Sequence, residues 1–173
     1  PTPANTSLSM AERLDPTVHA ALARSLGSLS HASALMATLD WALHLAASPG
    51  QRMDLAHLAL RQGQEMAAYA LARMAAGPDK EARHAVATPT QDRRFADPAW
   101  QQWPFNLMHQ SFLLTEQWWA AATHGVWGVD KHHEDMVAFA ARQFLDIFSP
   151  GNQPATNPVV LNRTLTQGGA NLL

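Results

Sequence analysis

The residue usage of this chain strongly favours helix over strand. Alanine is the commonest residue, valine is sparse, and isoleucine occurs once, at Ile147. Sheets are rich in β-branched residues, whereas alanine and leucine favour helices. The sequence therefore predicts an all-α fold with no substantial sheet.

The charge of the chain excludes several classes of partner. Charged residues make up 15% of the 173 residues, the formal net charge is -2, and lysine occurs only at Lys80 and Lys131. Such a chain has no basic field to hold a phosphate backbone and no polybasic membrane anchor. No run of about 18 apolar residues is present to span a bilayer. We expect a cytoplasmic protein with no nucleic-acid partner and no transmembrane segment.

The chain contains no cysteine, which removes several kinds of chemistry from these residues. A disulfide framework, a thiolate zinc site and a cysteine nucleophile all need that side chain. A serine nucleophile is not supported either, because no Gly-x-Ser-x-Gly elbow occurs, and Gly168-Gly169 lacks the lysine of a phosphate-binding loop.

Hydrophobic spacing predicts a helical hairpin module in the first half. Residues 31 to 47 place Leu35, Leu39, Ala42 and Ala46 on one stripe, and a second helix begins at Ser48-Pro49 and runs to Ala76. The short connection favours antiparallel packing of the two helices. A weaker helix over residues 16 to 26 precedes them, so the module covers residues 16–77, after a disordered tail at 1–15. On the second helix the expected apolar side carries Met53, Leu60, Ala67, Leu71 and Met74.

A second group of amphipathic helices follows a proline-containing linker at residues 78–91. A long helix is expected from Pro104 to His124, and the next one starts after Asp130 as N-cap and ends at Ser149-Pro150. A last short helix begins at Asn157-Pro158 and reaches Leu165. This second domain covers residues 92–173. The face of the middle helix that we expect to be buried carries Met136, Val137, Ala140, Ala141, Phe144, Ile147 and Phe148.

Tryptophan is concentrated in one part of the chain. Of six tryptophans, five lie between residues 100 and 127. A wide aromatic face usually packs in a core, and the alternative is a surface that docks onto a hydrophobic body or a second subunit. The candidate interface residues are Phe112, Trp118, Trp119 and Trp127.

Nine histidines raise the question of a metal site. The densest cluster is His132-His133-Glu134-Asp135, but neighbouring residues on a helix point about 100° apart, so the two imidazoles do not share one ion. An acidic first helical turn after Asp130 explains the cluster without a metal. Asp40 and His44, four residues apart, form a pair on one helix face. We predict no metal and no cofactor.

An ordered set of motif residues runs through the second half: Asp92, Arg94, Phe95, Trp100, Pro104, Arg142, Gln143, Asn157 and Pro158. In order and spacing, these family-motif residues resemble the N-terminal region of polyhydroxyalkanoate synthases, also called poly-β-hydroxybutyrate polymerases. Upstream, residues 39–45 with Ser48-Pro49-Gly50 resemble a short segment at the front of some of these enzymes. The resemblance covers residues 31–173, and the loop around Gly151 and Gln153-Pro154 departs from it.

The resemblance implies a non-catalytic part of an acyltransferase. In such synthases a following α/β-hydrolase domain with a Cys-His-Asp triad polymerises (R)-3-hydroxyacyl-CoA, and we expect that domain after residue 173. The implied partners are that catalytic domain, a second copy in a homodimer, and the polyester granule surface or its coat proteins. Two alternatives stay open: a stand-alone helical granule-associated or regulatory protein, and a metal-dependent helical hydrolase using His124, His132 and His133.

Overall fold

The structure, a computed structural model, describes residues 10, 14–18, 20, 31–76 and 93–170. Within these residues the chain is helical and contains no strand, which confirms the all-α prediction. The elements are α2 (His31–Ala46), α3 (Pro49–Ala76), the 3-10 helix η1 (Pro98–Gln101), α4 (Phe105–Thr123), α5 (Lys131–Ile147) and α6 (Pro158–Thr166). Of the weaker helix expected over 16–26, residues 14–18 are helical, and residues 21–30 lie outside the description.

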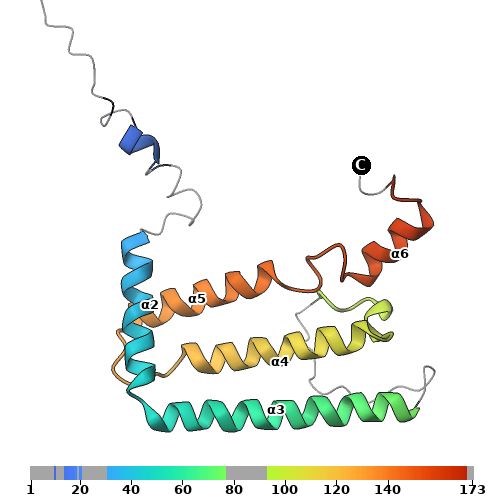
Figure 1. The fold of residues 1–173 in the computed structure, drawn as a ribbon, viewed down its shortest axis with the longest axis horizontal. Coiled ribbons are helices and arrows are strands. Elements are labelled where there is room, and N and C mark those ends of the chain that lie inside the picture. Colours follow the sequence, from blue (N-terminus) through green and yellow to red (C-terminus); the bar gives the residue numbers. More distant parts are fainter. Residues whose placement is uncertain (1–9, 11–13, 19, 21–30, 77–92, 171–173) are drawn as a thin grey trace, which may run out of the picture.

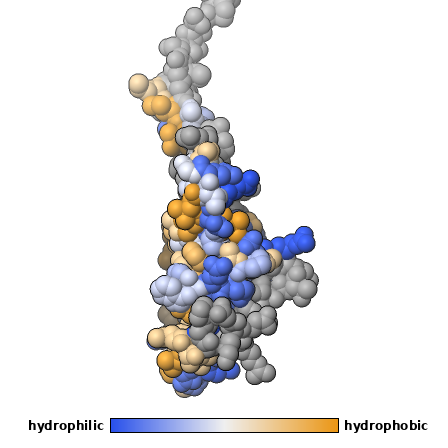
Figure 2. All heavy atoms as spheres, turned by 90° about the vertical axis from the view of Figure 1, so that its right-hand side faces the viewer, coloured by the Kyte–Doolittle hydropathy of each residue, from blue (hydrophilic) through white to orange (hydrophobic). Residues whose placement is uncertain are grey.

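The long helices form a single layer. In Figure 1, α3, α4 and α5 lie side by side with α4 in the middle, and α2 runs across one end of the layer. Viewed from the side, in Figure 2, the body is narrow and hydrophobic residues reach its surface. A layer one helix thick has two faces and two edges, so each helix leaves much of its circumference uncovered.

The helix ends lie where the sequence placed them, within one or two residues. The Asp130 side chain accepts from the His132 backbone N–H and begins α5, and the Asn157 side chain begins α6 by accepting from two backbone N–H groups. At the start of α3, however, the Ser48 hydroxyl donates to the His44 carbonyl at 2.7 Å. That hydroxyl therefore bonds a carbonyl at the end of α2.

Two clusters of buried side chains hold the layer together. One joins η1, α4 and the segment before them through Phe95, Trp100, Phe112, Leu113 and Leu114. The other joins α2 to α5 through Ala37, Met136 and Val137, with Trp41 packed against it. The two parts of the chain on either side of residues 77–92 are thus in contact.

The relation of α2 to α3 differs from the expected antiparallel hairpin. Figure 1 shows the two helices diverging at a large angle from their short connection, and α2 packs chiefly on α5 while α3 packs on α4. The Trp41 indole N–H donates to the Ala122 carbonyl at 2.8 Å, and the Trp118 indole N–H donates to the Leu55 carbonyl at 3.2 Å. Each bond gives a part-buried indole N–H a carbonyl acceptor on another helix. The first bond joins α2 to α4, and the second joins α4 to α3.

The expected core stripes of the first two helices are wrong in orientation. On α2 the buried side is that of Ala37, while Leu35 and Leu39 are exposed. On α3 the buried side chains are Leu55, Gln62 and Tyr69, and the predicted apolar side faces away from α4. Hydrophobic spacing predicts that a helix has an apolar stripe, but it does not predict which neighbouring helix, if any, covers that stripe. The exposed members of the α3 stripe are Met53, Leu60, Leu71 and Met74.

Candidate interaction surfaces

Asp40 forms a clasp between α2 and α5. Its carboxylate lies 3.0 Å from Nδ1 of His44 on the same helix and 2.7 Å from Nδ1 of His133 on α5. The Asp130 backbone N–H also donates to it, at 3.3 Å. The hydrogen bond from His133 is the main cause of the lowered pKa of Asp40. The pairing predicted between Asp40 and His44 is present, and His133 is a partner that sequence spacing did not reveal.

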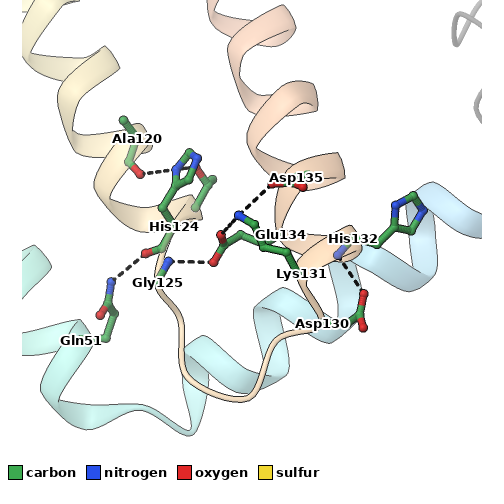
Figure 3. Close-up of polar contacts among 10 residues, drawn as sticks. Gln51, Ala120, His124, Gly125, Asp130, Lys131, His132, Glu134 and Asp135 are labelled. Carbon is green, nitrogen blue, oxygen red and sulfur yellow. Dashed lines mark hydrogen bonds and ion pairs between the residues drawn. The ribbon is translucent and has the colours of Figure 1, made fainter.

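Glu134, next to His133 in the predicted cluster, contacts the turn between α4 and α5, which is drawn in Figure 3. Glu134 accepts from the Gly125 backbone N–H at 2.7 Å and pairs with Lys131 at 2.6 Å. These contacts lower the pKa of Glu134, chiefly through Lys131, and raise the pKa of Lys131 to about 12, chiefly through Glu134. Figure 3 shows the imidazole of His132 turned away from that of His124.

Those histidines do not gather around one point. Across the described ranges, no group of three or more His, Asp or Glu side chains has the geometry to hold a metal ion. His133 is engaged by Asp40, and Nδ1 of His124 lies 2.8 Å from the Ala120 carbonyl of its own helix. The arrangement gives the alternative of a metal-dependent hydrolase no site in this part of the chain.

The four candidate interface aromatics are placed very differently. Phe112 is buried in the core beside Phe95, with ring centroids 6.0 Å apart. Trp118 and Trp119 are half-buried and stack edge to face, and Trp119 also lies against Trp41 of α2. Trp127, in the turn after α4, is 88% exposed. Among the four, it is the side chain with most of its surface open to a partner.

Arg94 is the centre of the largest polar cluster among the family-motif residues. Its guanidinium donates two hydrogen bonds of 2.9 Å to Glu116 on α4 and one of 3.1 Å to Asp146 on α5. The same group lies 5.4 Å from the ring centres of Phe95 and Phe112. One side chain thus links two helices to the segment before η1.

Most other motif residues have local structural roles. Trp100 is 1% exposed in the core, Pro104 precedes α4, and Pro158 occupies the first turn of α6. Asn157 caps α6 and its amide also donates to the Gly151 carbonyl at 2.6 Å. Arg142 and Gln143 are exposed on α5, and Asp92 lies outside the described residues.

A groove of about 820 Å³ runs between α4 and α5. Its walls combine apolar side chains such as Trp119 and Phe139 with charges of both signs, among them Arg142, Glu116 and Asp135. This mixture fits a protein segment better than a single charged small molecule.

Wide apolar surfaces are uncovered, and they include most of the large residues that the helical spacing predicted to be buried, so those predictions were wrong. Most of the large aliphatic and aromatic side chains that are about half or more exposed lie on three helices. Contiguous exposed apolar side chains on a folded chain make these helix faces candidate contact surfaces. They are Leu35, Met36, Leu39 and Leu43 on α2, Met53, Leu60, Leu71 and Met74 on α3, and Phe139, Phe144, Ile147 and Phe148 on α5.

Comparison with known families defines the class. Residues 91–173 match the family described as "Poly-beta-hydroxybutyrate polymerase (PhaC) N-terminus", and residues 9–51 match "Poly-beta-hydroxybutyrate polymerase N terminal". Residues 52–90 lie between the two matches, which together account for most of the chain. Both parts of the chain are therefore similar to the N-terminal region of poly-β-hydroxybutyrate polymerases, as the motifs predicted.

Curated proteins with similar sequences carry the same kind of name. The chain is 40% identical over 89 residues to a poly(3-hydroxyalkanoate) polymerase of Methylorubrum extorquens, covering 51% of this chain and 15% of that protein. It is 35% identical over 83 residues to "Poly(3-hydroxyalkanoate) polymerase subunit PhaC" of Rhizobium meliloti (strain 1021), covering 47% and 14%. The chain thus spans about one seventh of the length of these relatives. No solved structure matches it.

The described helices were also compared with what a membrane span requires. None of them is both long enough and apolar enough to cross a bilayer.

Proposed function

We propose that this chain is a non-catalytic N-terminal part of a polyhydroxyalkanoate synthase whose complete form polymerises (R)-3-hydroxyacyl-CoA by acyl transfer. In that role it serves dimerisation, association with the polyester granule and support of the catalytic domain. The observation that carries the proposal is the match of two polymerase N-terminal families to a layer of helices with uncovered apolar faces.

The side-chain chemistry supports the non-catalytic part of the proposal. The resemblance leads us to expect a cysteine nucleophile in the synthase, and these 173 residues contain no cysteine. The motif residues Arg94, Trp100 and Asn157 are engaged in an ion-pair cluster, the core and a helix cap. We therefore assign the acyl transfer to residues of the polymerase outside this chain.

Granule association is proposed for the outer edge of α3. Leu60 and Leu71 are 60% and 66% exposed there, on the side opposite the buried Leu55 and Tyr69. In Figure 1 this helix forms the border of the layer. An amphipathic helix at an edge can place its apolar side on a hydrophobic polymer without disturbing the packing of its other side.

An assay of acyl transfer tests the assignment of the chemistry. The purified chain should release no CoA from (R)-3-hydroxybutyryl-CoA, while the complete polymerase should release it and form polyester. Removing the region that corresponds to residues 93–170 should slow polymer formation by the complete enzyme. Release of CoA by the chain alone would refute the proposal.

A localisation assay tests the role of α3. A fluorescent fusion of the chain should concentrate on granules in polyester-accumulating bacteria, and the double variant Leu60→Ser with Leu71→Ser should become diffuse. The matched control replaces two polar exposed residues of the same helix, Arg61→Ser with Gln64→Ser, and should stay on the granules. Equal localisation of both variants would exclude the α3 edge as the contact.

A further inference from the structure

Helix α2 is apolar on two opposite sides. One side packs on α5 through Ala37 and Trp41. The opposite side, which we call the leucine face, consists of Leu35, Met36, Leu39 and Leu43, each 47% to 68% exposed. Asp40 is the single residue of the helix that is Asp, Glu, Lys or Arg. A helix that is apolar around most of its circumference is normally covered on both sides in its final assembly.

Helix α5 presents a stripe of which half is already covered. Met136 and Val137 are buried under α2. Further along the same side of the helix, toward its C-terminal end, the apolar residues are exposed. We call these residues the phenylalanine stripe: Ala140, Phe144, Ile147 and Phe148. The rings of Phe144 and Phe148 stack with centroids 4.7 Å apart, and both are about 60% exposed. The uncovered half therefore continues an interface that a helix already occupies.

We propose that the leucine face of one copy packs on the phenylalanine stripe of a second copy, and reciprocally, in a two-fold dimer. Each α2 then lies between its own α5 and the α5 of the partner, with one apolar side on each. This proposal rests on the dimerisation that forms part of the proposed function, and it specifies the surface and the arrangement.

The two surfaces match in length, and both are open to a second copy. Leu35 to Leu43 and Ala140 to Phe148 each span nine residues, which is about 12 Å from the first to the last along a helix. Because the phenylalanine stripe lies on the side of α5 that carries α2, a second α2 beside the first contacts it from the same side. One contact made twice closes the assembly, as a two-fold axis requires.

The area and charge also favour a second copy. The large side chains of the leucine face and the phenylalanine stripe each expose roughly 100 Å², and together they offer about 700 Å² per copy, near the ~800 Å² per partner of stable complexes. None of these side chains is charged, and the formal net charge of -2 gives little repulsion between copies.

Sedimentation of the intact chain gives the first test. At tens of micromolar the chain should sediment as a dimer, and Leu39→Ser or Phe148→Ser should raise the dimer dissociation constant at least about 30-fold, the effect expected at central interface residues. Leu165→Ser, at a side chain of α6 that is 82% exposed and outside both surfaces, is the matched control and should leave the constant unchanged. A monomeric wild-type chain overturns the proposal together with the role in dimerisation.

Cross-linking tests the pairing itself, because the chain has no cysteine of its own. A mixture of Leu39→Cys chains and Phe148→Cys chains should form a covalent dimer with a short bismaleimide, far more than either variant alone. If the wild type is a dimer but the mixture cross-links no better than the single variants, the α2–α5 pairing is refuted while dimerisation by another surface stands. Circular dichroism of each variant should match the wild type, since both positions are exposed.

Discussion

Replacing Arg94 with methionine should lower the stability of the helical layer without removing its packing volume. The methionine keeps an apolar stem beside Phe95 and Phe112, but it loses the two bonds to Glu116 and the bond to Asp146. Glu116 would then be a half-buried carboxylate without its cationic partner. The perturbation thus isolates the charged cluster from the aromatic core.

The expected magnitude follows from the burial of the pair. The Arg94 and Glu116 side chains are 30% and 24% exposed, between a surface pair and a buried one. Exposed pairs contribute about 0–1 kcal/mol, and removing one partner of a buried pair costs about 3–5 kcal/mol. We expect a loss of about 2 kcal/mol, which for a chain of this size lowers Tm by about 4–8 °C. Arg94→Lys keeps the charge but not the two parallel bonds, so it should cost about half as much.

Thermal unfolding followed by circular dichroism at 222 nm provides the assay. Arg93→Met, at the exposed neighbouring arginine, is the matched control and should leave Tm within about 1 °C. The double variant with Glu116→Gln should be less destabilised than the sum of the two single variants, because the partners share one interaction. Equal effects of the Arg93 and Arg94 substitutions would refute the reasoning.

Three further substitutions test the caps and the clasp. Asn157→Ala should cost about 1 kcal/mol and speed amide exchange in α6, since it removes the acceptor of two backbone N–H groups; unchanged exchange would contradict this. Gly128→Ala should lower Tm because φ is +90° there and a Cβ would lie 2.5 Å from the His44 ring, whereas Gly50→Ala, in open space, should not. Asp40→Asn should destabilise at pH 7 and progressively less as the pH falls below about 3.8: the lowered pKa of Asp40 means that its contribution is fully present above its unfolded pKa of about 3.8 and is lost as the pH falls through the folded value. A difference in Tm that stays constant from pH 7 to pH 3 would exclude this role of the clasp.

The helices and their ends were largely predictable from local sequence. Asp130 and Asn157 accept from the first backbone N–H groups of α5 and α6, as their positions before the helices indicated. The motif set around Arg94 and Trp100 pointed to the polymerase family that the comparison confirms. These features depend on residues within one or two helical turns of each other, or on residue order, and both are readable without a fold.

The partners of each helix were not predictable in this way. His133 reaches Asp40 across 93 positions of sequence, and the Trp41 indole finds the Ala122 carbonyl across 81. No local pattern encodes such pairings. The burial of each residue in the tryptophan-rich segment likewise depends on where α2 and α3 pack. Trp100 is buried, Trp118 and Trp119 are half-buried, and Trp127 is exposed.

The sequence by itself determined that the chain is helical, where its helices begin and end, and which family its second half resembles, because backbone capping and helix propensity act over a few residues. The tertiary structure alone decided which side of each helix is buried. Helix α2 has two apolar sides and α3 has an apolar side opposite Leu55 and Tyr69, so burial depends on which neighbour arrives. In a layer one helix thick, that choice leaves the strongest predicted stripes of α2 and α3 facing outward and not toward the core.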